Sequence, residues 1–593
     1  MGRRHSHLRF AGPRASSAVW RPVAARDDRS NPGAFPLRLF PAPVLPRSRG
    51  NVWSFARTRI ADPLGRARCP VYLPGPARRH GREAVVPERG NTTLVSDREP
   101  MADDGLNPED FTLPSLRPRD LFAHFGPGLI LMMTGIGTSH VVTAPTAGGR
   151  FAYALLWCLP VAYVFKYYGF EMAFRFTNAT GKSLLEAYAT ARWKWPLWYV
   201  MATTLIQCAI GQAGRLIAAA AVLYYLFSEY LGLPVPLEAY AALLGVLSVA
   251  IILRGSYKAV ENTTKALAGV LVLSSVAVYI VQPAPLAEMG NFFLFEIPDG
   301  SWLVIAGFLG LLPTGIDVSL QASEWGKAKR AGMSKVRPHL EATGVAPRFD
   351  PFTSPASDLA VDTARLSPHA REYCRRWFRI GLWDFRTGHV VSFVLAAIFV
   401  LLAAVWLYPS PIEGRAVMGE IAGIFTLSVG PGMMMIFMLG ALAATYSTAF
   451  NYFDGWPRIV GACCRNLFRT TARLNGISPE DRADLERRRT WNSEYNIYRM
   501  TMFYSLIASV LYITFDPRPV FLVLVASALA FFVAPVIYFF NLYFCLKVIP
   551  KEDDLFYPSW FARWFGGLSL LIFTGLCGIL IFARVFRIPL FGA

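Results

Sequence analysis

Long apolar runs recur along the chain between about residue 124 and residue 584, separated by polar or Pro-rich stretches. Each run holds about twenty residues, the length at which a helix crosses the roughly 30 Å hydrocarbon core of a bilayer. Backbone N–H and C=O groups find no partners in hydrocarbon, so each run must form a helix. The expected spans are 124–146, 152–174, 196–228, 237–254, 259–282, 302–325, 386–408, 420–450, 497–515, 519–546 and 561–584. The pattern predicts an all-α integral membrane protein with about 11 transmembrane helices.

The charges between the spans give the expected orientation. Lys and Arg gather after the second, sixth and eighth spans, for example at Lys182, Lys327 and Arg458. The segment from Gln282 to Ser301 has none and carries three acids. Because positively charged loops remain on the cytoplasmic side, the N-terminus is predicted to be cytoplasmic, in a multi-pass protein of a bacterial inner or plasma membrane.

Composition supports this class of protein and disfavours others. The chain has 593 residues, of which 54% are apolar and 17% are charged, and its mean hydropathy is +0.35. Globular proteins carry about 25% charged residues, so too few charges are present here to cover several soluble domains. A soluble enzyme, a disordered scaffold and a nucleic-acid-binding protein are disfavoured. The eight cysteines show no CxxC pair or Cys/His ligand spacing, so neither disulfides nor zinc are indicated.

The net charge of +19 comes mainly from the N-terminal segment. Residues 1–100 hold 19 Arg, no Lys and 7 acids, with 13 Pro and no sustained hydrophobic periodicity. Such a segment cannot bury enough apolar surface to offset its ordering entropy, so residues 1–115 are expected to be a disordered Arg/Pro-rich extension. Three explanations remain open: an organelle transit peptide, a basic arm that contacts anionic lipid, or sequence upstream of a true start at Met101.

Residues 120–590 are expected to form the transmembrane domain, which contains two large cytoplasmic loops. The loop 326–385 is rich in Pro, Ser and Arg, and the loop 453–495 is dense in Arg. Both are interpreted as solvated linkers that could contact anionic headgroups. A regulatory or partner-docking role is the alternative.

Two spans contain residues that interrupt a helix, and both interruptions coincide with polar side chains. In the first span, Gly137 precedes the polar run Thr138-Ser139-His140. In the sixth, Pro313 has no N–H for the carbonyl of Leu309, which is expected to be free to bind a ligand. Interrupted helices at matching places in two halves of a bundle indicate a transporter's binding site. Spans 1 and 6 are five helices apart, as a 5+5 inverted repeat requires; simple kinks or close helix packing are the alternative.

The residues around these interruptions resemble a known family. The matching residues are Gly126-Pro127-Gly128, Gly137-Thr138-Ser139-His140, Ala147-Gly148, Tyr153-Ala154-Leu155-Leu156-Trp157, Arg175, Thr180-Gly181-Lys182-Ser183-Leu184 and Tyr257-Lys258. This set is similar to the Nramp (natural resistance-associated macrophage protein) divalent metal transporters, over roughly residues 120–550. The resemblance implies a leucine-transporter-like fold with 5+5 inverted repeats, broken helices 1 and 6, and alternating access around a cation site at the membrane midplane.

The departures from that family fall on its metal-binding residues. Typical members carry Asp-Pro-Gly-Asn in helix 1 and Ala-x-x-Met-Pro-His in helix 6. The positions of the Asp, Asn, Ala, Met and His are here Gly137, His140, Leu309, Leu312 and Thr314. A thioether favours softer transition metals, whereas oxygen ligands suit Mg, Ca or Mn, so selectivity for manganese or iron does not carry over. The acids that members use in helix 3 are replaced by Cys208 and Gly211, which removes the basis for expecting proton coupling.

Candidate ligands of the substrate gather at the two interruptions. They are Gly137, Thr138, Ser139, His140, Leu309, Leu312, Thr314 and Asp317. Of these, His140 and Asp317 could ligate a metal directly. An intramembrane carboxylate is a functional candidate by default, but Asp317 could instead pair with a Lys or Arg or satisfy freed backbone groups. His140 could alternatively take up a proton or bond a backbone carbonyl, and Arg215 could neutralise Asp317 or extend to the interface.

The sequence therefore predicts a secondary transporter that moves a cation by alternating access, with a divalent metal ion favoured. One alternative is an amino-acid or other organic-solute transporter on the same fold, in which half-helix N-termini hold a carboxylate. The other is a transport-dead membrane sensor or scaffold. No nucleophile and base pair or metal triad stands out, so neither an enzyme activity nor a cofactor is expected. The expected partners are the transported cation and membrane lipid, with no nucleic acid and no obligate protein partner.

Overall fold

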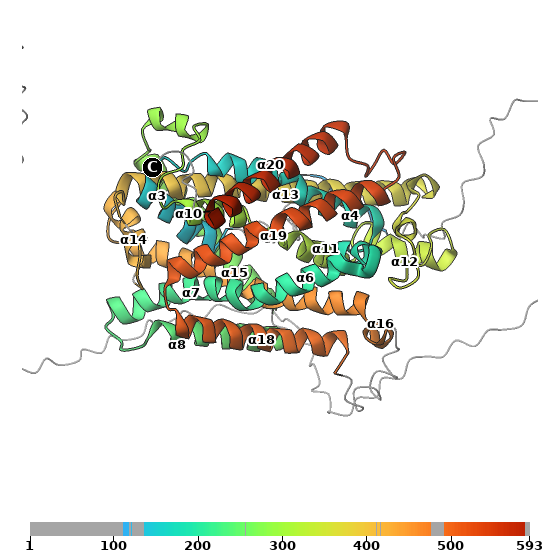
Figure 1. The fold of residues 1–593 in the computed structure, drawn as a ribbon, viewed down its shortest axis with the longest axis horizontal. Helices are drawn as coiled ribbons and strands as arrows, with labels where there is room; N and C mark the ends of the chain where they lie inside the picture. Colours follow the sequence, from blue (N-terminus) through green and yellow to red (C-terminus); the bar gives the residue numbers. More distant parts are fainter. Residues whose placement is uncertain are drawn as a thin grey trace, which may run out of the picture. The chain divides into compact units, whose positions relative to one another are not determined.

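The computed structural model describes residues 111–117, 120, 136–254, 257–410, 412–415, 417–475 and 491–586, with the backbone alone for 257–268, 473–475 and 583–586. Most of the expected N-terminal extension and the start of the first span therefore lie outside the described residues. Every regular element within them is a helix (Figure 1). In chain order these are η2 (Ser139–Thr143), α3 (Ala144–Phe151), α4 (Cys158–Thr180), α5 (Leu184–Tyr188), η3 (Arg192–Lys194), α6 (Trp195–Ile206), η4 (Gln207–Gly211), α7 (Gln212–Leu223), η5 (Tyr224–Tyr230), α8 (Leu237–Leu253), α9 (Tyr257–Val281), η6 (Leu286–Phe292), α10 (Trp302–Leu311), α11 (Val318–Ala328), α12 (Met333–Thr343), η7 (Ala356–Leu359), η8 (Thr363–Arg365), α13 (Pro368–Trp406), α14 (Val417–Ser428), α15 (Met433–Leu467), α16 (Arg469–Asn475), α18 (Glu494–Phe515), α19 (Pro519–Val548) and α20 (Trp560–Phe586).

Several of these helices have the length and composition of membrane spans. Six helical stretches in the described residues qualify by length and hydropathy: Arg192–Tyr230, Pro368–Trp406, Met433–Leu467, Glu494–Phe515, Pro519–Val548 and Trp560–Phe582. Four shorter apolar helices accompany them: Leu237–Leu253, Gly269–Val281, Trp302–Leu311 and Val417–Ser428. All ten overlap spans expected from the apolar runs, so the all-α membrane class agrees with the structure.

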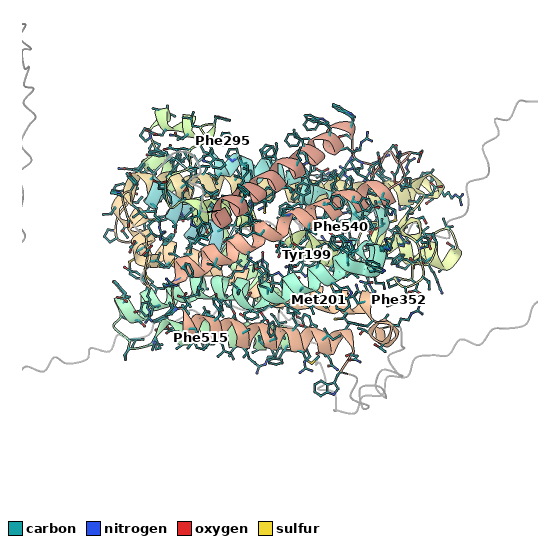
Figure 2. The ribbon with its side chains drawn as sticks, viewed as in Figure 1. Tyr199, Met201, Phe295, Phe352, Phe515 and Phe540 are labelled. Atoms are coloured by element: carbon teal, nitrogen blue, oxygen red, sulfur yellow. The ribbon has the colours of Figure 1, made fainter. Side chains whose placement is uncertain are left out.

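Helix α18 shows the surface of a lipid-facing helix. Its exposed apolar side chains recur every four residues at Ile507, Leu511 and Phe515, which are 59%, 53% and 86% exposed. Figure 2 shows Phe515 at the end of this helix. Residues spaced by four lie on one face of a helix, so α18 presents a continuous apolar stripe. Such a stripe is costly in water and suits contact with lipid tails.

Helices α10, α15 and α19 lie in the middle of the bundle, whereas α8 and α18 lie along one edge (Figure 1). The contact between α10 and α19 depends on a small residue. A Cβ added to Gly310 of α10 would lie 1.9 Å from the carbonyl oxygen of Ser527 on α19. Close backbone approach at small residues is the usual way membrane helices pack. The contact fixes the half-helix that ends at the interruption of the sixth span.

The expected loop 326–385 is folded onto the bundle, and the interpretation of this segment as a solvated linker is wrong. It contains α12, two short 3-10 turns and the beginning of α13, which starts 18 residues before the predicted span 386–408. Arg337 of α12 is only 1% exposed and donates to the carbonyls of Thr180 at 2.7 Å and Leu359 at 2.6 Å. Buried apolar residues surround it in a second cluster: Phe111, Val336, Leu340, Tyr373, Phe378 and Phe556. Because one buried guanidinium satisfies several carbonyls, a Pro- and Arg-rich segment acquires a fixed structure.

The eighth expected span, 420–450, is two helices. The run Gly430-Pro431-Gly432 separates α14 from α15, and Gly430 has a φ of +137° that favours glycine. Helix α15 then continues to Leu467, so the first part of the expected loop 453–495 is helical. Helix α16 covers more of it, and residues 476–490 lie outside the described residues. Hydropathy alone did not separate α14 from α15, because both flanking stretches are apolar.

Candidate functional site

The interruption of the sixth span is present where the sequence places it. Helix α10 ends at Leu311, Leu312 is extended with φ −93° and ψ 132°, and α11 begins only at Val318. Pro313 cannot donate to a carbonyl one turn earlier, and its ring disfavours helical geometry at Leu312. The last carbonyls of α10 are therefore left without N–H partners from a continuing helix.

A buried lysine binds these carbonyls. The Nζ of Lys166, from α4, donates to the carbonyl oxygens of Leu309 at 3.0 Å, Gly310 at 2.9 Å and Leu312 at 2.6 Å. Lys166 is fully buried. The expectation that the Leu309 carbonyl is free was therefore wrong, because an ammonium from a neighbouring helix occupies it. The negative end of the α10 dipole and three carbonyl oxygens together favour a cation at this point.

The other end of the interruption carries a carboxylate. Asp317 precedes the first residue of α11, where the helix dipole favours negative charge. The indole N–H of Trp456, from α15, donates to its Oδ2 at 3.2 Å. A Cβ on Gly315 would lie 2.2 Å from Oδ1 of Asp317, so a larger residue there would require the carboxylate to shift. The charges of Arg215 and Lys166 both interact with that of Asp317.

Arg215 lies inside the bundle rather than at the interface. The guanidinium is over the ring of Tyr452 at 3.9 Å and the ring of Trp456 at 4.7 Å, and its Nη1 donates to the Gly211 carbonyl at 2.7 Å. Its Nε and Nη2 have no hydrogen-bond partner among the described residues. Because Arg215 is 1% exposed, the alternative in which it extends to the interface is excluded.

Thr314 connects the interruption to the same aromatic pair. Its Oγ1 lies 3.2 Å from the hydroxyl of Tyr452, and both residues are buried. Leu309 and Leu312 direct buried apolar side chains into the core. Of the four candidates in the sixth span, Thr314 and Asp317 therefore contribute polar side-chain atoms, and Leu309 and Leu312 contribute backbone oxygens.

The imidazole of His140 contacts α4 and α13. Its Nε2 lies 3.2 Å from the hydroxyl of Tyr163 on α4 and 3.0 Å from the carbonyl oxygen of Ser392 on α13. Its Nδ1 lies 3.0 Å from the Ser139 hydroxyl. These contacts match the alternative in which His140 bonds a backbone carbonyl of another helix instead of a metal ion. No group of three or more His, Cys, Asp or Glu residues in the described part of the chain could hold a metal, so His140 and Asp317 do not form such a site with a third ligand.

The interruption of the first span differs from the expected one. Ile136 and Gly137 form a bend, and the chain is helical from Thr138 through the wide turn η2. The polar residues Thr138, Ser139 and His140 therefore belong to a helix rather than to an unwound segment. A Cβ at position 137 would lie 1.8 Å from Oγ1 of Thr448 on α15, so no carboxylate fits at Gly137. The Thr138 hydroxyl is buried without a hydrogen-bond partner among the described residues.

Two buried amides lie beside the charged residues. Gln207 precedes Arg215 on the third span, and Gln321 follows Asp317 on α11. Neither side chain has a hydrogen-bond partner among the described residues. Buried polar atoms are nearly always satisfied by protein or by ordered water. These amides therefore add unsatisfied polar groups to the surroundings of Arg215 and Asp317.

Sequence reasoning missed Lys166, although a signal was available. The residue lies in the middle of the expected span 152–174, among apolar and aromatic residues. An ionisable residue inside a span is a functional candidate by default, so Lys166 qualifies on the same ground as Asp317. Tyr452 and Trp456 could not have been found this way, because aromatic residues in a long apolar helix are indistinguishable from packing residues.

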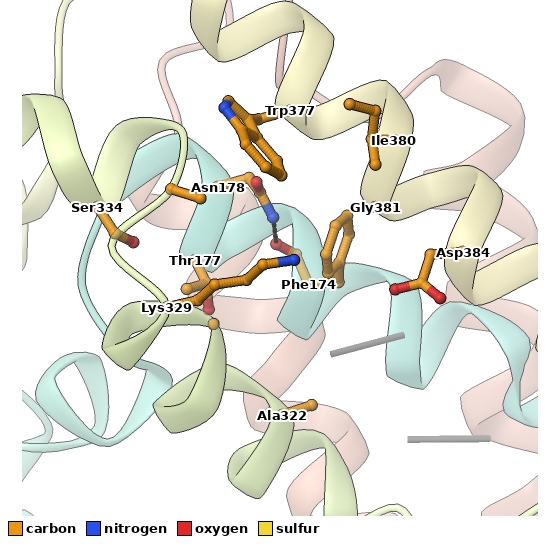
Figure 3. A pocket seen from close by; sticks show the side chains of 12 residues that line it. Phe174, Thr177, Asn178, Ala322, Lys329, Ser334, Trp377, Ile380, Gly381 and Asp384 are labelled. Atoms are coloured by element: carbon orange, nitrogen blue, oxygen red, sulfur yellow. Dashed lines mark hydrogen bonds between the residues drawn. The ribbon is translucent and has the colours of Figure 1, made fainter. Parts of the chain in front are cut away.

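A pocket lies elsewhere in the bundle, between α4, α11 and the beginning of α13 (Figure 3). Its wall includes Asn178, Lys329, Trp377 and Asp384, as Figure 3 shows. None of its lining residues comes from η2 or α10. The pocket is therefore separate from the group of Lys166, Arg215 and Asp317.

The chain matches the family described as natural resistance-associated macrophage protein-like (Nramp) over residues 128–583. An uncharacterized protein of Pasteurella multocida is 22% identical over 346 residues, which are 57% of this chain and 69% of that protein. A crystal structure of a mutant Eremococcus coleocola manganese transporter is similar with a TM-score of 0.53 at 14% identity, covering 82% of this chain and 93% of that one. The structure of the same transporter in complex with an aromatic bis-isothiourea substituted compound is similar with a TM-score of 0.53 at 13% identity, covering 79% of this chain and 89% of that one.

At such low identities the structural likeness shows the fold alone, and this fold is the leucine-transporter-like one expected from the sequence. The family match covers well over half of the chain. The chain therefore belongs to the Nramp family.

Proposed function

We propose that this protein is a secondary transporter that moves a cation, with a divalent metal ion favoured, by alternating access. Its membership of the Nramp family and its likeness to a manganese transporter support a metal-ion transporter in a multi-pass membrane protein. The proposed location is a bacterial inner or plasma membrane with a cytoplasmic N-terminus, and residues 120–590 are the proposed transporter domain. No enzymatic step and no cofactor belong to this proposal.

The observation that carries the proposal is the convergence of three carbonyl oxygens on one cationic group. The carbonyls of Leu309, Gly310 and Leu312 lie 2.6–3.0 Å from a single nitrogen, in the interior of the bundle. Backbone carbonyls at interrupted helices are the groups that replace the hydration shell of an ion in transporters and channels. The interruption therefore has the geometry of a cation site, which in the described structure is filled by an ammonium.

The donor set favours a hard cation. Oxygen is the only ligand atom at the interruption, from the three carbonyls, Thr314 and Asp317. Leucine stands at the position where family members have a thioether, so no soft ligand is available. Carbonyl and carboxylate oxygens suit magnesium, calcium or manganese better than softer transition metals. We therefore favour one of these three ions as the substrate.

The alternative of an organic solute with a carboxylate is supported by the charges at the site. Lys166 and Arg215 are buried cations near the interruption, and Asp317 supplies a single carboxylate just before α11. Two of the Arg215 nitrogens lack hydrogen-bond partners among the described residues, and a carboxylate would satisfy both. An amino acid or a related anion is therefore the second candidate substrate.

Uptake into proteoliposomes separates these candidates. The purified chain is reconstituted and supplied in turn with Mg²⁺, Mn²⁺, Ca²⁺ and a mixture of amino acids, with protein-free liposomes as the control. We expect uptake of at least one divalent cation. Uptake of amino acids alone would favour the second candidate, and uptake of nothing would favour a sensor or scaffold without transport.

A further inference from the structure

We propose that Lys166 is a tethered cation that fills the transport site in the absence of substrate, so that an incoming cation must displace its ammonium from the carbonyls of α10. This inference rests on the cation transport proposed above and names the residue that controls access to the same site. It concerns Lys166, α10 and Asp317.

The first argument is the match between donors and acceptors. A lysine ammonium has three N–H donors and no acceptor. Lys166 finds three carbonyl oxygens at 2.6, 2.9 and 3.0 Å. Its hydrogen-bonding capacity is therefore filled by neutral backbone oxygens, and no carboxylate forms an ion pair with it within 4 Å in the described structure. Coordination of this kind is how carbonyls hold an inorganic cation.

The second argument is a comparison with another buried cation at a helix end. The guanidinium of Arg337 donates to the last carbonyl of α4, that of Thr180, at 2.7 Å, and it also bonds the carboxylate of Glu341 at 2.7 Å. Lys166 bonds the carbonyls of α10 but has no carboxylate within 4 Å among the described residues. Desolvating a charged side chain is expensive unless strong interactions replace its water. The charge of Lys166 is therefore balanced by carbonyls alone, as that of a bound inorganic cation would be.

The third argument is that the ammonium and a metal ion cannot share this position. A divalent cation binds oxygen at about 2.0–2.6 Å, so it would lie inside the triangle of carbonyls that Nζ now faces. Two positive charges at such a separation repel strongly in a medium of low dielectric constant. Binding of the metal therefore requires that the Lys166 side chain leave the carbonyls.

The displaced ammonium has a place to go. A lysine side chain is a flexible four-carbon stem that carries a point charge. Asp317 lies at the other end of the same interruption, directly before α11, whereas the carbonyls that Lys166 now binds lie at the end of α10. A shift from the α10 carbonyls toward this carboxylate would keep the ammonium compensated while the substrate occupies its former position. Asp317 thus serves as the acceptor for Lys166 in the loaded state.

The test is equilibrium binding of Mn²⁺ to the purified full chain, compared between wild type and Lys166→Met. Methionine keeps the length of the side chain and removes the charge. We expect the variant to bind Mn²⁺ at least about tenfold more tightly, because binding no longer requires displacement of a like charge. We also expect its thermal unfolding midpoint to fall without metal and to recover when Mn²⁺ is added, since a bound ion again satisfies the carbonyls. Equal or weaker Mn²⁺ binding by the folded variant would overturn the proposal.

Two further variants keep this test decisive. Lys166→Gln retains N–H donors for the carbonyls without the charge, and it replaces the methionine variant if that variant does not fold. We again expect tighter Mn²⁺ binding than in wild type. Unchanged Mn²⁺ binding would contradict displacement of the ammonium. Lys547→Met is the matched control, because Lys547 is exposed at the end of α19 and its Nζ donates to the Tyr543 hydroxyl at 3.1 Å. We expect it to bind Mn²⁺ as wild type does.

Vesicle uptake distinguishes failure of this inference from failure of the transport proposal. If wild type accumulates Mn²⁺ and Lys166→Met binds it no more tightly, the displacement mechanism is wrong and transport stands. If Lys166→Met gains Mn²⁺ affinity and neither protein accumulates any cation, the tethered cation is supported and the transport proposal is wrong.

Discussion

Two groups of charged residues in this protein are balanced differently. At one end of the bundle, five ion pairs at 2.6–3.2 Å link α5, α11, α12, α15 and α18. This ion-pair network contains four cations and four carboxylates: Lys182, Lys327, Arg337, Arg465, Glu186, Glu324, Glu341 and Glu494. At the interruption of the sixth span, Lys166 and Arg215 share one carboxylate, Asp317, and make their closest contacts with carbonyls and aromatic rings.

We interpret this difference as a distinction between charges that stabilise the fold and charges that take part in the proposed transport. A cation paired at short range with a carboxylate mainly ties one helix to another, and its removal is expected to affect stability. A buried cation whose nearest partners are neutral is not neutralised by an opposite charge at short range. Such a group is able to respond to another ion, so the interruption is where changes should alter transport. Each variant below tests one side of this distinction.

The largest effect is expected for Asp317→Asn. The change leaves Arg215 and Lys166 without the carboxylate that interacts with both. Because the change removes the carboxylate proposed to ligate the cation and to accept the displaced Lys166 ammonium, we expect initial cation uptake to fall by about a hundredfold or more. The measurement is uptake per folded protein in proteoliposomes. Asp516→Asn, in the segment between α18 and α19, is the matched control. Uptake close to wild type in Asp317→Asn would remove this residue from the site.

Arg465→Met tests the paired region. Arg465 bonds Glu494 at 2.6 Å and Glu324 at 3.2 Å, and the change leaves both carboxylates without this partner. We expect the free energy of unfolding to fall by about 3 kcal/mol, because the pair is largely buried. Cation uptake per folded protein should stay within about twofold of wild type, since the residue does not contact the interruption. A loss of uptake without a loss of stability would break the distinction between the two regions.

The carboxyl of Glu186 makes the stabilisation from the ion-pair network depend on pH. Burial alone raises the pKa of its carboxyl, but the charges of Lys327 and Arg465 outweigh this effect. With Lys182 and the Ser183 N–H, they lower the pKa from an ordinary 4.5 to about 2. Since the folded-state pKa lies below the unfolded one, this stabilisation is complete above about pH 4.5 and is lost as the pH falls toward 2.

We therefore expect Glu186→Gln to lower the free energy of unfolding by about 2 kcal/mol at neutral pH. The difference from wild type should shrink as the pH falls below 4.5. Unfolding of both proteins in detergent over this pH range provides the measurement. A difference that does not change with pH would show that Glu186 contributes by packing rather than by charge.

The smallest effect on stability is expected for His140→Ala. The change removes contacts to Tyr163 at 3.2 Å and to Ser392 at 3.0 Å. We expect a loss of stability of about 1–2 kcal/mol, the cost of buried hydrogen-bonding groups left without a partner. The dissociation constant for Mn²⁺ should change by less than about threefold, because the imidazole faces α4 and α13. Abolished Mn²⁺ binding would instead establish His140 as a ligand.

The interruption of the sixth span could be predicted from the sequence because proline has a local and unambiguous effect. Pro313 ends α10 wherever the surrounding helices lie. What fills the interruption could not be predicted, because Lys166 approaches from another helix and its target depends on how α4 packs against α10. The fold was accessible because length and hydropathy define membrane helices one at a time.

The first span shows the limit of reasoning from glycine and polar residues. Gly137 is explained by its close approach to Thr448, and the polar residues after it remain helical. Glycine permits an unwound segment but equally permits tight helix contact, and only tertiary structure decides between the two. The folding of α12 was missed for a similar reason. Arg337 was counted among solvated charges, whereas four carbonyls and Glu341 surround it in the structure.

The most direct test of the cation site is an anomalous difference map of crystals of this protein grown with Mn²⁺. We predict a peak about 2.0–2.6 Å from the carbonyl oxygens of Leu309, Gly310 and Leu312, with the ammonium of Lys166 moved away from them. A manganese peak at another place in the bundle, with Lys166 still bound to the three carbonyls, would contradict the account.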